Sequence, residues 1–110
     1  MHPAPITRVL LALEELRKLD PELPIQQAVA FLVIARQEGI PQKKVAELVG
    51  VSKSAAQRIF DKLSDRGTNG KPGLGLIEVW PGSFDRRETE ARLTPKGRRL
   101  LASLENIIGG

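Results

Sequence analysis

Apolar residues recur at helical spacing through the first part of the chain. Over residues 6–19 they form one broad stripe, which predicts an amphipathic helix that Asp20 and Pro21 end. A stripe this wide needs two neighbours, so one of them can belong to a second chain. Residues 25–38 are apolar nearly all round, which predicts a central buried helix that Gly39 ends.

Two shorter helices are predicted next, over residues 41–49 and 53–66. Gly50 breaks the helical pattern between them, and Ser52 is a favoured N-cap residue for the second helix. Gly67 is expected to end that second helix. These two helices are short enough to form a tight helical corner.

The remaining residues predict a β-hairpin and a final helix. Residues 68–75 are rich in glycine and are expected to form a flexible loop. Strands are predicted over 76–80 and 89–93, on either side of a turn at 81–88. A last helix begins at Pro95. The expected fold class is therefore mainly α with a small β-hairpin (α+β), in the order of four helices, the hairpin and one helix.

The spacing of small and apolar residues in the two short helices is that of a helix-turn-helix. Ala46 lets the second helix approach closely, and Gly50 stands where the turn is expected to need a positive φ. We expect four side chains to close the corner: Val45 and Leu48 from the first helix, Ala56 and Ile59 from the second.

Helical geometry places Ser54, Gln57 and Arg58 away from Ala56, near the start of the second helix. Recognition helices present such N-terminal residues to base edges in the major groove of DNA. Arginine suits guanine and glutamine suits adenine, so we predict that these three residues read bases. The alternative is an ordinary solvated helix face.

Five polar residues around this face are predicted to contact DNA phosphates. Helix N-termini attract phosphate, and lysine strengthens that attraction. The open alternative is again a solvated surface. The predicted phosphate contacts are Gln42, Lys43 and Lys44 at the start of one helix, and Lys53 and Lys62 on the flanks of the next.

The hairpin tip at 81–88 carries Arg86 and Arg87 and is predicted to act as a wing. Arginines at such a tip can enter an adjacent minor groove, where narrow A·T tracts concentrate negative potential. Asp85 can pair with one of them, so we expect Arg87 to be partly structural and Arg86 to contact DNA. An Asp–Arg network without a DNA role is the alternative. Trp80 and Phe84 are expected to pack within the hairpin.

Charge and composition favour a polyanion partner over an enzyme. Residues 36–67 and 68–99 each carry seven basic and four acidic side chains, whereas both ends of the chain are slightly acidic. The chain has no cysteine and one histidine, and its glycines lack the spacing of a dinucleotide-binding loop. We therefore expect no catalytic site, metal site or cofactor.

Targeting signals are also missing from the sequence. It has no apolar run of the roughly 18 residues that a membrane helix needs. Its N-terminus lacks the basic and apolar pattern of a signal peptide. We therefore expect a cytoplasmic protein without membrane contact.

The segment FDRRETEARLTPKGRRLLASL resembles the wing and following helix of MarR-type regulators (multiple antibiotic resistance regulators). The resemblance extends over about 24–104, and the chain resembles a short variant with an insertion at 68–75. It implies a winged helix-turn-helix with a DNA-binding core at 41–94. It also implies a homodimer joined through 1–23 and 95–110, bound to a pseudo-palindromic operator. The matching positions are Asp85, Arg87, Leu93, Thr94, Lys96 and Gly97.

These observations predict one domain over 1–110 that binds double-stranded DNA sequence-specifically as a dimeric transcriptional regulator. A replication or packaging module of a phage or plasmid with the same fold is one alternative. A protein-interaction winged helix that does not bind DNA is another. The sequence names neither the operator nor an effector.

Overall fold

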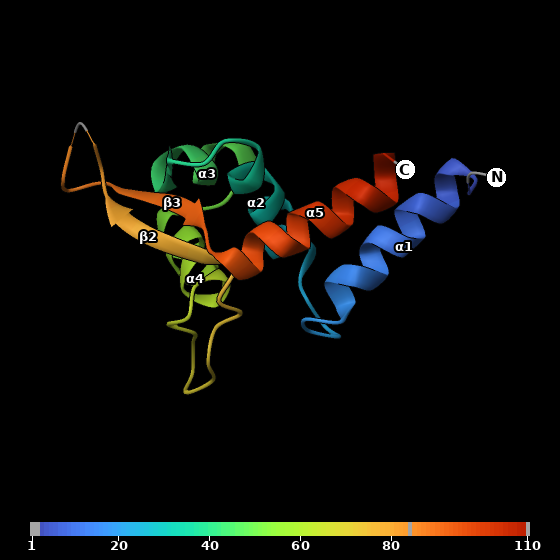
Figure 1. Cartoon of the computed structure of the whole chain (residues 1–110). Coiled ribbons are helices and arrows are strands. Elements are labelled where there is room, and N and C mark those ends of the chain that lie inside the picture. Colours follow the sequence, from blue (N-terminus) through green and yellow to red (C-terminus); the bar gives the residue numbers. More distant parts are fainter. Residues whose placement is uncertain (1–2, 84, 110) are drawn as a thin grey trace.

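The computed structural model describes residues 3–83 and 85–109, so predictions about His2 and Phe84 lie outside it. Within these residues the chain forms five helices and a three-stranded antiparallel sheet (Figure 1), which confirms the expected mainly-α fold with a hairpin. The elements are α1 (Pro5–Arg17), α2 (Ile25–Arg36), β1 (Ile40–Pro41), α3 (Gln42–Val49), α4 (Lys53–Leu63), β2 (Ile77–Pro81), β3 (Thr89–Leu93) and α5 (Pro95–Gly109).

The sheet contains one strand more than predicted. Its order is β1-β3-β2, with Ile40 opposite Ala91 on one side and Val79 opposite Ala91 on the other. β1 is only two residues long, so no alternation marks it, and Pro41 was predicted to be helical. β1 forms because β3 offers it a partner far away in sequence, and it places the start of α3 beside the base of the hairpin.

The connection after α4 differs from its prediction. α4 ends at Leu63 and does not continue to residue 66, because the backbone of Ser64 is extended, with φ −80° and ψ −173°. The Ser64 hydroxyl donates to the Asp61 carbonyl at 3.0 Å. The first half of the glycine-rich stretch, residues 68–71, forms a hydrogen-bonded turn, and residues 72–75 have no regular secondary structure. Thr68 and Lys71 exchange backbone hydrogen bonds of 3.1 and 2.9 Å.

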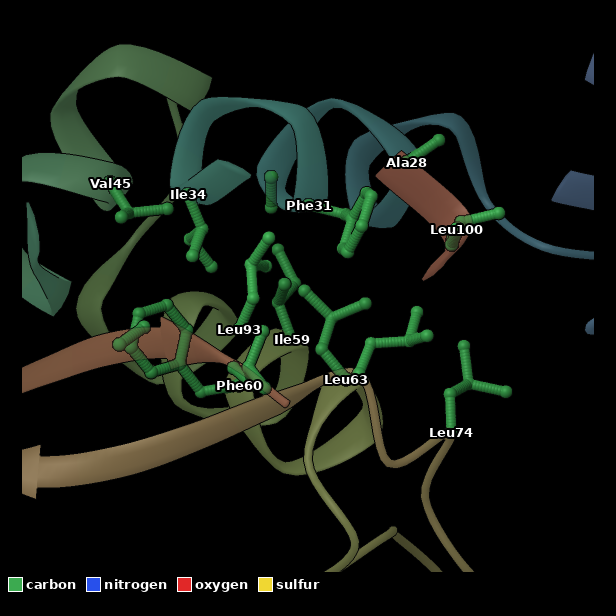
Figure 2. Packing of buried hydrophobic residues seen from close by; sticks show 14 of the residues in the cluster. Ala28, Phe31, Ile34, Val45, Ile59, Phe60, Leu63, Leu74, Leu93 and Leu100 are labelled. Carbon is green, nitrogen blue, oxygen red and sulfur yellow. The ribbon is translucent and has the colours of Figure 1, made fainter. Parts of the chain in front are cut away.

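The core lies between α2, α4 and the sheet. Figure 2 shows Phe31 and Ile34 of α2 facing Ile59 and Leu63 of α4, with Leu93 of β3 beside them. α2 is thus central, as predicted, but it is not buried all round. Ile25, Val29 and Leu32 are exposed along one side of it.

α5 ties the hairpin to α1. A Cβ at Gly97 would lie 2.1 Å from the Leu76 carbonyl oxygen, so glycine is what allows α5 to approach the strand this closely. The Arg98 guanidinium donates two hydrogen bonds of 2.9 Å to the Glu38 carboxylate. These contacts fix the direction in which α5 leaves the core.

α1 and α5 lie side by side and extend together away from the core (Figure 1). Leu100 and Leu104 of α5 are buried there, together with Ala12 and Leu16 of α1. No helix in the described part of the chain is long and apolar enough to cross a membrane. α1 still leaves five large apolar side chains exposed, namely Ile6, Val9, Leu10, Leu11 and Leu13.

Candidate nucleic-acid interface

The corner between α3 and α4 has the geometry that its sequence predicts. Gly50 adopts φ 80° and ψ 38°, and its N–H donates to the Ala46 carbonyl at 2.8 Å. The Ser52 hydroxyl accepts a hydrogen bond from the Ala55 N–H at 3.1 Å and caps α4. Ala56, Ile59 and Val45 are buried in the corner. Leu48 is exposed, so the prediction that it helps to close the corner is wrong.

A groove of about 410 Å³ lies beside the N-terminal half of α4. α3 and the tip-side end of the hairpin form its other walls. Three cations and one carboxylate lie along it, which makes it favourable for an anionic partner. The lining residues are Gln42, Lys43, Ala46, Lys53, Ser54, Ala56, Gln57, Arg87, Glu88 and Thr89.

The predicted base-reading residues are all exposed on α4. Ser54 and Gln57 line the groove, whereas Arg58 is exposed outside its lining. Arg58 makes no ion pair or side-chain hydrogen bond with residues 3–83 or 85–109. Its guanidinium is therefore available to an external acceptor.

A chain of side-chain hydrogen bonds crosses the groove. The Thr89 hydroxyl donates to Gln42 Oε1 at 3.1 Å, and Gln42 Nε2 donates to Gln57 Oε1 at 3.2 Å. Gln57 Nε2 then donates to Asp61 Oδ1 at 3.1 Å. Gln42 was predicted to contact phosphate, but here its amide joins the hairpin to α4. No local sequence pattern shows this contact, because residues 42 and 89 meet only in the fold.

The structure separates the predicted phosphate contacts. Lys43 and Lys53 lie in the groove, and Lys44 is exposed beside it with its Nζ 3.6 Å from Glu47. Lys62 lies near the far end of α4, where its Nζ is 3.1 Å from Asp20 Oδ2. The Glu22 backbone N–H and then Lys62 hold the pKa of the Asp20 carboxyl below its ordinary value. Lys62 therefore braces α4 against the α1–α2 connection.

The hairpin tip is held by two carboxylates. The buried Glu90 carboxylate accepts from the Ser83 N–H at 2.8 Å and from its hydroxyl at 3.1 Å. The Asp85 carboxylate accepts from Arg87 Nε and Nη2, both at 3.2 Å, and from its backbone N–H at 2.9 Å. The Arg87 side chain and then its N–H lower the pKa of the Asp85 carboxyl.

The two wing arginines thus differ in their surroundings. Arg87 is paired, yet its side chain remains 91% exposed and it lines the groove. Arg86 is exposed and forms no ion pair within the described residues. Trp80 lies opposite Glu90 on the edge strand β2 and is 50% exposed, so only half of its surface packs within the protein.

Comparison with known proteins gives matches by structure. No protein-family model and no curated protein matches the sequence. A MarR transcriptional regulator from Methanosarcina mazei Go1 superposes with a TM-score of 0.68 at 21% identity, over 87% of this chain and 62% of that one. MarR itself gives 0.67 at 25% identity, over 92% of this chain and 61% of that one.

The fold is that of the MarR-family transcriptional regulators. A structure of MepR from S. aureus in complex with DNA also shares it, with a TM-score of 0.71 at 16% identity over 87% of this chain and 71% of that one. The chain spans less than two thirds of the length of the Methanosarcina regulator and of MarR. The MarR-type resemblance of the sequence is thereby confirmed for the fold.

Proposed function

We propose that the chain is a sequence-specific, double-stranded DNA-binding transcriptional regulator that acts as a homodimer. The observation that carries this proposal is the groove in which the exposed start of α4, the N-terminus of α3 and a basic wing converge. This arrangement matches a recognition helix with its flanking phosphate contacts. The DNA complex of MepR, which has the same fold, supports the proposal. The proposal assigns no catalytic step to the chain.

Each group has a role that follows from its chemistry. Ser54, Gln57 and Arg58 contact base edges from α4, and Arg58 suits guanine O6 and N7. Lys43, Lys44 and Lys53 contact phosphates, and the N–H groups at the start of α3 add to them. Arg86 contacts the adjacent minor groove. Arg87 holds the tip that carries Arg86 through its contacts with Asp85. Lys62 is left out because it pairs with Asp20.

The dimer is supported by the surface of α1. A soluble chain rarely leaves several large apolar side chains exposed on one helix unless a partner covers them. Leu10 is 56% exposed and Ile6 is 76% exposed. A second copy that packs α1 and α5 against the same helices would cover them and would present two recognition helices to one duplex.

Replacement of Arg58 tests the proposal most simply. We expect Arg58→Ala to weaken binding to the preferred duplex by about 1–3 kcal/mol and to relax the preference at one base pair. Fluorescence anisotropy over a salt series measures this, and binding should weaken as salt rises, because bound phosphates release counterions.

Arg36→Ala is the matched control, because it removes the same charge from the exposed last turn of α2, outside the groove and outside the two helices proposed to join the dimer. It should leave the base preference unchanged. Equal binding by Arg58→Ala and the unaltered protein would refute the assignment of Arg58. No salt-dependent binding to any duplex would instead favour a protein-interaction role.

A further inference from the structure

The groove contains one side chain that links the hairpin to α4. Gln42 is half-buried at the first position of α3. Both ends of its amide are already bonded, at 3.1 Å to Thr89 and at 3.2 Å to Gln57. The Gln42 amide thus links Thr89 of the hairpin to Gln57 of α4, and through the second of these bonds it can act on Gln57.

The direction of the hydrogen-bond chain is fixed by its last member. The Asp61 carboxylate only accepts, so the group of Gln57 that faces it must be the NH₂. The Gln57 oxygen then faces Gln42 and needs a donor, which is the Gln42 NH₂. The Gln42 oxygen in turn needs a donor, which the Thr89 hydroxyl supplies. The order of donors and acceptors therefore follows from chemistry along the whole chain.

This order leaves Gln57 with a defined pair of free groups. A side-chain amide has two N–H donors and two oxygen lone pairs. Gln57 uses one N–H on Asp61 and one lone pair on Gln42, so one of each remains. In the major groove adenine offers one donor, N6–H, and one acceptor, N7, which is the complement of that pair. Without the hydrogen bond from Gln42, the Gln57 side chain would sample several rotamers on the exposed face of α4.

We propose that Gln42 is a positioning residue for base recognition, which holds the Gln57 amide in the orientation that reads adenine. The inference rests on the proposed function and deepens it. It replaces the predicted phosphate contact of Gln42 with an effect on sequence preference. Thr89, next to the wing, would then help to orient Gln57 through its hydrogen bond to Gln42.

A double-mutant cycle on the full chain tests this. The duplexes are the preferred site and variants that differ at single base pairs, and anisotropy gives the affinity ratio at each position. Gln57→Ala should remove a preference for A·T of about tenfold or more at one position. Gln42→Ala should remove most of the same preference, and the double variant should lose no more than Gln57→Ala alone.

Lys43→Ala is the matched control from the neighbouring position of α3. It should weaken binding to all duplexes by a similar factor and reduce the salt dependence, while the preference for A·T stays. Thr89→Val removes the hydroxyl at nearly constant shape and should lower the same preference in part. Circular dichroism melting shows whether each variant is folded.

Two results would overturn the inference while the proposed function stands. One is a Gln42→Ala variant that loses affinity uniformly, as Lys43→Ala does. The other is a Gln42→Ala effect that adds fully to that of Gln57→Ala. If the unaltered protein shows no sequence preference at any position, the proposed function fails and the inference fails with it.

Discussion

The wing depends on a carboxylate whose protonation state can be set by pH. Arg87 donates from its side chain and its backbone to Asp85, and both contacts lower the pKa of that carboxyl below its ordinary value of 3.8. A carboxyl with a lower pKa in the folded state stabilises that state above its unfolded pKa. The contribution disappears as pH falls through the folded pKa. The contact between the Arg87 guanidinium and the Asp85 carboxylate is therefore fully formed at neutral pH and is lost only in acid.

The Arg87 side-chain N–H resonance, followed by NMR, should shift with pH with a midpoint below 3.8, and Asp85→Asn should abolish that transition. We expect little change in overall stability, because the pair is exposed to water. A midpoint at or above the ordinary aspartate pKa would show that Arg87 does not stabilise the Asp85 carboxylate.

Among the elements, the turn between α3 and α4 fixes the angle between these two helices. Gly50 has φ 80°, and a Cβ there would meet no other atom within 4 Å. Gly50→Ala should therefore destabilise the fold by about 1–2 kcal/mol through backbone strain alone. Urea unfolding measures the change, and Gly109→Ala at the open end of α5 is the control. An unchanged stability would show that the corner does not need this conformation.

Local sequence patterns account for the elements better than for the contacts between them. Local patterns predicted the helices, the hairpin and the corner around Gly50, because caps and periodicity act within a few residues. They missed β1, which depends on β3 for its partner. They also gave no sign of the contacts that Gln42 and Lys62 make, because their partners Thr89 and Asp20 lie 47 and 42 positions away. Contacts between distant residues carry no local signal.

The whole molecule is elongated because the helix pair α1 and α5 extends away from the core (Figure 1). Ile6, Val9, Leu10 and Leu13 of α1 line a shallow apolar hollow on it. Burying such side chains in a dimer is worth about 1.5–3 kcal/mol each. A second copy is therefore expected to stabilise the helix pair α1 and α5 as well as to double the DNA contacts.

Leu10→Lys should convert the dimer to a monomer, because a buried unpaired ammonium is strongly unfavourable. Light scattering coupled to gel filtration measures the mass, and anisotropy should show weaker binding to a two-half-site duplex. Gln37→Lys adds the same charge at the exposed end of α2 and should remain dimeric. A monomeric unaltered protein, or a dimeric Leu10→Lys variant, would contradict this interface.

We propose that α4 and the wing together read duplex DNA, and in vitro selection of bound DNA from a random pool at physiological salt tests this. We expect enrichment of an inverted repeat whose half-sites lie about 10–10.5 base pairs apart, or a multiple of that spacing. A pool that stays random after repeated selection would show that α4 and the wing do not read a DNA sequence.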